Sequence, residues 1–243
     1  MSPITTEPLH RVATARVVQV SDTHLSSAAG VSPVMRQLLD WITHDPPDLV
    51  VHTGDIVVDD PDNAADRTFA REVLDAVPCP VRVIPGNHDV GFYGEDEARD
   101  RRLEAFVATW GADRFVIDIA GWRLVGVNAY QLGEPADDTW LREAVTTVMP
   151  VAVFIHQPVG NEPIDGWEMP SSARAAFGAA TDGADVRLTT SGHRHRSWTA
   201  GGVVWAPSAT LVGDAIEGTD PRPGAVELIF HRDGTFASRF VRL

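Results

Sequence analysis

The sequence predicts an α/β fold in which short buried strands alternate with helices. Six short runs are rich in Val, Ile or Leu, which is typical of strands buried on both faces. They cover residues 16–20, 48–51, 81–84, 123–127, 151–155 and 186–190. Segments of helical periodicity separate the runs, and clusters of polar residues follow them directly. This alternation indicates layers of helices on a largely parallel sheet.

Five segments between the runs are expected to be helices. In residues 33–43, Ser32 is a candidate N-cap, and Val34, Leu38 and Ile42 recur at helical spacing. The other four segments are residues 63–77, 96–110, 138–148 and 171–180.

The C-terminal part has strand patterns with little helix between them. The candidates are residues 203–206, 225–230 and 235–241, and Asp233-Gly234 is a turn signal between the last two. We expect these three strands to complete a second sheet. Because no linker rich in Gly, Ser or Pro divides the 243 residues, we predict a single domain over residues 1–243.

The composition narrows the possible partners and compartments. The formal charge of −14 disfavours a nucleic-acid polymer as partner, since such binding needs clustered positive charge. The first twenty residues lack a signal-peptide pattern, and no apolar stretch approaches the ~20 residues of a membrane span. The only cysteine, Cys79, excludes an intrachain disulfide and suits a reducing compartment. We therefore expect a cytoplasmic protein with no membrane partner.

Five of the strand runs end in Asp, Asn or His. The clusters are Asp22-Thr23-His24, His52-Thr53-Gly54-Asp55, Gly86-Asn87-His88-Asp89, His156-Gln157-Pro158 and Gly192-His193-Arg194-His195. In open α/β sheets, sites form beyond the carboxyl ends of strands, so these clusters can converge. Imidazole and carboxylate together suit Zn, Fe, Mn or related ions.

The number of candidate ligands indicates more than one ion. There are seven: Asp22, His24, Asp55, Asn87, His156, His193 and His195. A single structural zinc takes four ligands, so seven suggest two ions that share a bridging residue. A carboxylate has two oxygens and can bridge, which favours Asp55. Each motif alone is more often a turn, a helix cap or a polar loop; the ordered set, each after a strand run, indicates a metal centre.

The ordered motifs resemble those of the calcineurin-like metallophosphoesterase superfamily. Its pattern is Asp-x-His, Gly-Asp, Gly-Asn-His-Asp/Glu, a lone His and Gly-His-x-His, and the chain matches it in order over residues 16–196. Within the superfamily, the chain is similar to the bacterial class III cyclic-nucleotide phosphodiesterase-like branch. The resemblance implies a four-layer α/β/β/α sandwich of two mixed sheets flanked by helices. One departure is Gln157, where many relatives have a second His before the Pro.

The resemblance also implies a role for each residue. One ion would be held by Asp22, His24, Asp55 and His195, and the other by Asp55, Asn87, His156 and His193. His88 would face the scissile phosphate, and Asp89 would orient its ring. The expected cofactors are two divalent or trivalent ions among Mn, Fe, Zn and Co.

The expected activity is hydrolysis of small phosphate esters, with a phosphodiesterase of cyclic nucleotides or similar molecules as the main hypothesis. Two ions about 3.5–4 Å apart can hold a bridging hydroxide that attacks phosphorus. His88 can then protonate the leaving oxygen. The alternatives are a phosphomonoesterase, a glycerophosphodiesterase or a nucleotide pyrophosphatase of the same superfamily, a nuclease, or a non-catalytic interaction module. Such a module should have lost ligands, and none is lost here.

For several residues near the motifs, the sequence allows a structural role and an alternative. His52 is expected to support its strand end, and metal binding is the minor alternative. Asn128 and Tyr130 follow a strand run, and we expect an ordinary turn with substrate contact as the alternative. Arg194 and Arg196 are expected to be exposed loop arginines, or to hold a second phosphate or a leaving group.

Overall fold

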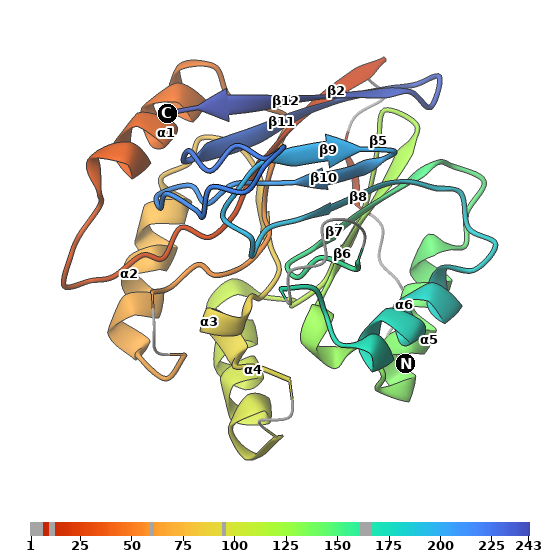
Figure 1. Ribbon diagram of the computed structural model, residues 1–243, viewed down its shortest axis with the longest axis horizontal. Helices are drawn as coiled ribbons and strands as arrows, with labels where there is room; N and C mark the ends of the chain where they lie inside the picture. The colour runs from red at the N-terminus through yellow and green to blue at the C-terminus, as the bar shows by residue number, and fades with distance from the viewer. Residues whose placement is uncertain (1–6, 10–12, 59–60, 94–95, 161–166) are drawn as a thin grey trace.

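Two β-sheets lie face to face between helices in the computed structural model, which describes residues 7–9, 13–58, 61–93, 96–160 and 167–243 (Figure 1). The strands are β1 (Glu7–Leu9), β2 (Thr14–Val20), β3 (Leu49–His52), β4 (Val81–Val83), β5 (Phe115–Ile119), β6 (Trp122–Val127), β7 (Val151–Ile155), β8 (Val186–Ser191), β9 (Trp198–Ala200), β10 (Val203–Trp205), β11 (Gly224–His231) and β12 (Phe236–Arg242). The helices are α1 (Pro33–His44), α2 (Ala64–Asp75), α3 (Asn87–Val90), α4 (Asp96–Trp110), the 3-10 turn η1 (Ala129–Gln131), α5 (Pro135–Val145) and α6 (Ser171–Thr181).

Both sheets are mixed. The five-stranded sheet has the order β12-β11-β2-β3-β4, and the seven-stranded sheet has the order β1-β5-β6-β7-β8-β10-β9. Strands β2, β3 and β4 are parallel, as are β6, β7, β8 and β10. The pairs β11–β12, β11–β2, β5–β6 and β9–β10 are antiparallel. The predicted four-layer sandwich of two mixed sheets is therefore confirmed.

Alternate residues along the strands divide between two apolar cores. Val17, Phe154 and Leu228 belong to the core between the sheets, which contains residues from both of them. Val18, which follows Val17 in β2, faces the opposite side of the sheet and shares a core with Leu38 of α1. The figure shows α1 and α2 on one side of the sheets and α5 and α6 on the other (Figure 1). Burial of each large apolar side chain contributes about 1.5–3 kcal/mol, which makes the paired sheets a rigid support for the loops at their edges.

Most predicted helices and strands are confirmed with small changes at their ends. The hydroxyl of Ser32 accepts a hydrogen bond from the amide of Met35 at 3.1 Å, so it caps α1 as expected. The predicted helix over residues 96–110 has the bounds of α4. Helix α5 begins at Pro135, three residues earlier than predicted, because proline suits the first turn of a helix.

The expected grouping of the C-terminal strands is wrong in one respect. Strand β10 does not join the last two strands; it pairs with β8 and β9 in the seven-stranded sheet, whereas β11 and β12 extend the sheet that contains β2. Strand β5 was not predicted, and it forms a hairpin with β6 through Ala120 and Gly121, both at positive φ. The single domain over residues 1–243 stays a prediction. No helix in the described ranges is long and apolar enough to cross a membrane.

Candidate metal centre

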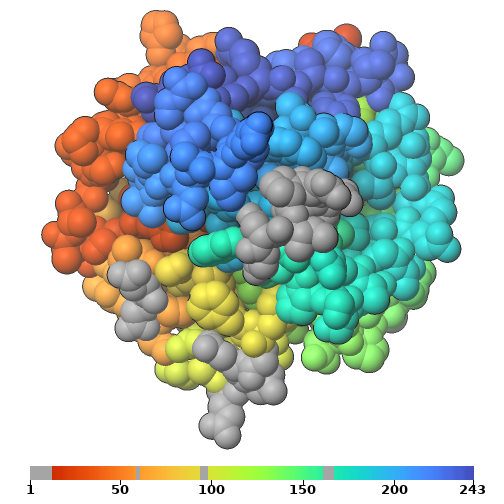
Figure 2. All heavy atoms as spheres, viewed as in Figure 1, coloured from red at the N-terminus to blue at the C-terminus, as the bar shows by residue number. Residues whose placement is uncertain are grey.

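The polar clusters meet at one edge of the two sheets. Asp22 and His24 follow β2, Asp55 follows β3, Asn87 and His88 begin α3 after β4, and residues 156 and 193–195 follow β7 and β8. Backbone hydrogen bonds extend beyond the strands and hold neighbouring loops together: Asp22 N donates to Gly54 O at 2.9 Å and Gly192 N to His156 O at 3.0 Å. Ligand atoms from the loops after β2, β3 and β8 lie within 4.8 Å of one another, as do those from the loops after β3, β7 and β8. On the face in Figure 2, the orange, yellow, turquoise and blue parts of the chain border one another. The predicted convergence of the clusters is therefore confirmed.

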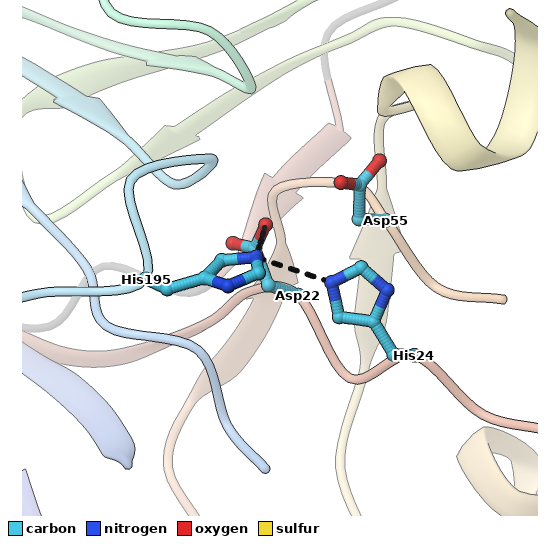
Figure 3. A group of neighbouring side chains, drawn as sticks. All are labelled: Asp22, His24, Asp55 and His195. Atoms are coloured by element: carbon cyan, nitrogen blue, oxygen red, sulfur yellow. Dashed lines mark hydrogen bonds and ion pairs between the residues drawn. The ribbon is translucent and has the colours of Figure 1, made fainter. Parts of the chain in front are cut away.

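Four side chains form a first cluster. The ligand atoms of Asp22, His24, Asp55 and His195 all lie within 4.8 Å of one another. Nε2 of His195 lies 3.2 Å from Asp22 Oδ1 and 3.2 Å from Nε2 of His24. Figure 3 shows the four side chains pointing toward one another from three separate loops.

A second cluster shares Asp55 with the first. Nε2 of His156 lies 3.4 Å from Asp55 Oδ2, 3.2 Å from His193 Nδ1 and 3.2 Å from Asn87 Oδ1. All four side chains are buried. Asp55 belongs to both clusters and therefore occupies the position expected of a bridging carboxylate.

The two clusters suit metal ions in chemistry and in spacing. Two atoms bound about 2.1 Å from one ion at a tetrahedral angle are about 3.4 Å apart, close to the distances between the ligand atoms. Asp22 and Asp55 are fully buried, and their ion-pair partners among the described residues are histidines only. Buried carboxylates are ordinarily paired or coordinated to a metal, so these residues fit two cations.

The backbone at the clusters is strained. Six described residues other than glycine have positive φ, and five of them are proposed ligands: Asp22, His24, Asp55, His193 and His195. Such conformations are uncommon for side chains with a Cβ, although Asp and His tolerate them better than most. Strain of this kind costs about 1–3 kcal/mol per residue and collects at functional sites. Its concentration on the candidate ligands supports a functional role for the loops.

Electrostatics keep the two carboxylates ionised. Burial acts to raise the pKa of Asp22, but a hydrogen bond from His195 and the charges of His156 and His195 lower it to about 2. Burial also opposes ionisation of Asp55, yet the charge of His156 and its hydrogen bond hold the pKa of that carboxyl well below its usual range. Burial lowers the pKa of His193 to about 3, so this imidazole is neutral. Burial acts to lower the pKa of His156, but the charge of Asp55 and its hydrogen bond raise it to about 9. Since ionised carboxylates and neutral imidazoles are the forms that bind metal, Asp22, Asp55 and His193 are already in that form, whereas His156 must lose a proton when an ion binds.

Neighbouring groups fix the tautomers of two proposed ligands. Nδ1 of His156 lies 2.7 Å from Thr53 O and donates to it, so Nε2 is the atom that would lose its proton and bind an ion. Nε2 of His193 faces the side-chain amide of Gln157 at 3.4 Å, and Oε1 of that amide is buried with no hydrogen-bond partner among the described residues. Rotation of this amide by about 180° brings Oε1 to Nε2 of His193, where it accepts the ring proton. Nδ1 of His193, which faces the cluster, then carries the lone pair.

The structure explains His52 as a support of the loops. Its Nδ1 accepts a hydrogen bond from Gly54 N at 3.2 Å, so the proton lies on Nε2, 3.0 Å from the hydroxyl of Thr23. That hydroxyl donates in turn to Ile56 O at 3.0 Å. Burial lowers the pKa of His52 to about 3 and keeps the ring neutral. The expected strand-end role is confirmed.

Comparison with known proteins places the chain in a family. A model of the calcineurin-like phosphoesterases matches residues 15–197. The chain belongs to the calcineurin-like phosphoesterase family. The resemblance drawn from the ordered motifs is thereby confirmed.

Two curated relatives and one solved structure illustrate the match. The chain is 30% identical over 175 residues to the glycerophosphodiester phosphodiesterase GpdQ of Enterobacter lignolyticus, covering 61% of this chain and 60% of that protein. It is 38% identical over 155 residues to a probable cyclic nucleotide phosphodiesterase of Moraxella catarrhalis, covering 55% and 53%. The matches thus span about half to three fifths of the length of these relatives. A dimetal phosphatase of Danio rerio shares the fold, with a TM-score of 0.57 and 15% identity over 94% of this chain and 98% of that one.

His88, the family's catalytic candidate, lies beside the shared carboxylate. Its backbone amide donates to Asp55 Oδ1 at 2.8 Å, and its Nε2 lies 3.9 Å from Oδ2. Its ring packs edge-on against His24 with centroids 4.8 Å apart. The His88 side chain is 29% exposed, whereas most of the proposed ligands are buried. It can therefore meet a substrate that arrives from solvent.

The contacts of Asp89 differ from the expectation that its carboxylate orients the ring of His88. Its carboxylate accepts hydrogen bonds from the amides of Gly86, Ile56 and Val57 at 2.8–3.3 Å. No hydrogen bond joins it to the His88 ring among the contacts described. Asp89 ties the loop after β3 to the start of α3, so its influence on His88 acts through the backbone.

Tyr130 and Asn128 have supporting positions. The hydroxyl of Tyr130 donates to Asn87 Oδ1 at 3.3 Å, and burial raises the pKa of that phenol well above its usual value, so it keeps its proton. Asn128 caps η1 by accepting from Tyr130 N at 3.0 Å, and its amide donates to Asp113 at 2.8 Å. Asn128 thus has a turn role, while Tyr130 orients a proposed ligand.

The expectation that Arg194 and Arg196 are exposed loop arginines is wrong. Both are buried, with 3% and 2% of their surface exposed. The guanidinium of Arg194 lies 4.0 Å from the ring centroid of Trp205 and 3.6 Å from Glu168. A planar cation can stack on an indole, and such contacts stabilise when they exclude water. Arg194 therefore anchors the segment between the ligands His193 and His195.

Gly192 allows two ligand loops to pack closely. A Cβ at this position would overlap the hydroxyl of Ser21 and crowd the carboxylate of Asp22. We expect Gly192→Ala to displace Asp22 and to weaken metal binding at the first cluster by about 10–100-fold, as loss of a supporting residue does. Calorimetric titration with Mn²⁺ measures this change. Gly178→Ala, in open space on α6, is the matched control and should bind metal normally; equal affinities in both variants would contradict the packing argument.

Proposed function

We propose that the protein is a dinuclear-metal-dependent hydrolase of small phosphate esters. The observation that carries the proposal is the pair of ligand clusters that share Asp55, with the half-open His88 beside that carboxylate. One ion would be held by Asp22, His24, Asp55 and His195, and the other by Asp55, Asn87, His156 and His193. Mn, Fe, Zn and Co all suit this mixture of carboxylate, amide and imidazole.

The bound ions, the buried carboxylates and His88 would have separate roles in the reaction. When bound, the two ions would supply Lewis acidity for the phosphoryl group and make hydroxide available near neutral pH. The buried carboxylates of Asp22 and Asp55 hold negative charge at fixed positions within the ligand clusters. The side chain of His88 is partly exposed beside Asp55, and it would give a proton to the departing alkoxide. Asp89 would hold the loop that carries His88 in place.

A small phosphodiester is the substrate class that we favour, since curated relatives are named as phosphodiesterases of cyclic nucleotides and of glycerophosphodiesters. The acidic charge of −14 supports a small substrate over a nucleic-acid polymer. The single cysteine, Cys79, supports the cytoplasm as the compartment.

A substrate panel tests the proposal. With Mn²⁺ bound, bis-p-nitrophenyl phosphate and cyclic AMP should be hydrolysed faster than p-nitrophenyl phosphate, and chelation of the metal should stop all three reactions. Preference for the monoester would assign the protein to the phosphomonoesterases. Absence of turnover on every ester would contradict an enzymatic role.

A further inference from the structure

A small cavity adjoins the candidate metal centre. It lies against His193 and His195 and has a volume of about 100 Å³. Its remaining lining comes from Trp167, Arg194, Arg196, Val212, Gly213 and Asp214. A cavity of about 150 Å³ can enclose benzene. This cavity is smaller but opens to solvent, so it can enclose part of a single ring.

Two of the lining side chains are apolar and exposed. The side chain of Trp167 is 48% exposed and that of Val212 is 73% exposed, and both belong to the few large hydrophobic side chains that the described chain leaves in water. The ring of Trp167 is inclined at 61° to that of His193, with centroids 5.2 Å apart. Exposed apolar groups that gather beside a polar site are typical of ligand contact.

Little of the positive charge in the lining is open to a ligand. The side chains of Arg194 and Arg196 are buried, and the guanidinium of Arg194 is engaged with Trp205 and Glu168. Asp214 adds a negative charge. Because the two arginines are buried, the cavity is poorly suited to hold a second phosphate. A neutral flat group, which can stack on an indole and bury its edge against Val212, matches it better.

We infer that this cavity binds an aryl or heteroaryl ring of the ester, with Trp167 as the specificity-determining residue. The inference rests on the proposed function, because the phosphate must bind at the metal centre for its organic group to reach Trp167. Stacking of a ring on an aromatic side chain is worth roughly 5- to 150-fold in affinity by alanine substitution. Esters with an aromatic group should therefore bind in preference to esters with a small alkyl group.

The test compares phenylphosphonate with methylphosphonate on the Mn²⁺-loaded protein by calorimetry. Both have the same head group and, at a pH above the second pKa of each, the same charge. Their C–P bonds are stable to phosphoester hydrolysis, so binding is read without turnover. The natural protein should bind phenylphosphonate at least fivefold more tightly, at the lower end of the stacking effect. Trp167→Ala should remove this preference and leave the Kd of methylphosphonate unchanged. Trp167→Phe should keep most of it, and Val148→Ala, which truncates an exposed apolar residue outside the cavity, should keep all of it.

The other outcomes separate this inference from the proposed function. If the natural protein binds both phosphonates equally, the cavity does not select rings, although the metal centre still binds phosphorus anions. If Trp167→Ala weakens both ligands equally, Trp167 acts by supporting His193, and the inference is overturned. If neither phosphonate binds the loaded protein, the proposed function fails together with the inference.

Discussion

Asp55→Ala is expected to impair metal binding at both clusters at once. Asp55 is the only carboxylate that the two clusters share, and its oxygens lie near ligand atoms of each. The loss of affinity should exceed the roughly 10–100-fold that follows removal of a supporting residue, and activity should fall with it. Asp22→Ala should weaken the first ion and leave the second, which is held by Asp55, Asn87, His156 and His193.

Elemental analysis after equilibration with Mn²⁺ gives the metal content of both variants. Asp55→Asn is the matched control for folding, because its amide oxygen can still accept from the backbone amide of His88. This variant should fold normally yet bind the ions more weakly than the natural protein. Tight binding of two ions and normal turnover in Asp55→Ala would show that Asp55 is not the bridge.

His88→Ala is expected to remove catalysis and to leave metal binding intact. The His88 ring lies 3.9 Å from Asp55 Oδ2 and is partly exposed, which suits a proton donor better than a ligand. The rate on an alkyl phosphodiester should fall by ~10²-fold or more, the range of general acid catalysis. The loss should shrink for p-nitrophenyl esters, whose leaving group needs less protonation.

Metal content and leaving-group dependence together decide the role of His88. Loss of one ion from His88→Ala would make His88 a ligand. An equal fall in rate for good and poor leaving groups would mean that His88 positions the phosphate or stabilises charge, and that it does not donate the proton.

The sequence predicted the parts of the molecule that depend on local pattern. Buried strands, helical periodicity and the polar residues directly after them were visible as runs, and the order of the motifs placed the seven candidate ligands in one site. The hairpin partner β5 and the pairing of β10 depend on which strand edges are open, so local patterns did not reveal them. Three-residue strands such as β1 and β9 are too short to show any periodicity.

Contacts between distant residues explain what the sequence missed at the site. Trp167 and Val212 are 45 residues apart in the sequence and belong to no motif, yet they line one cavity beside His193. Arg194 follows a ligand and was expected in water, but Trp205 lies where its guanidinium can stack. Gln157 stood out only as a departure from the family pattern, and its contact with His193 gives it a supporting role. Such roles depend on tertiary packing rather than on spacing along the chain.

The most direct test of the two-ion proposal is a titration of metal-free protein with Mn²⁺. Bound metal and the hydrolysis of bis-p-nitrophenyl phosphate are measured on the same samples. Because the two clusters share Asp55, we predict two ions per chain at saturation, with full activity only as the second ion binds. A firm limit of one ion per chain, or full activity with a single ion, would contradict the proposal.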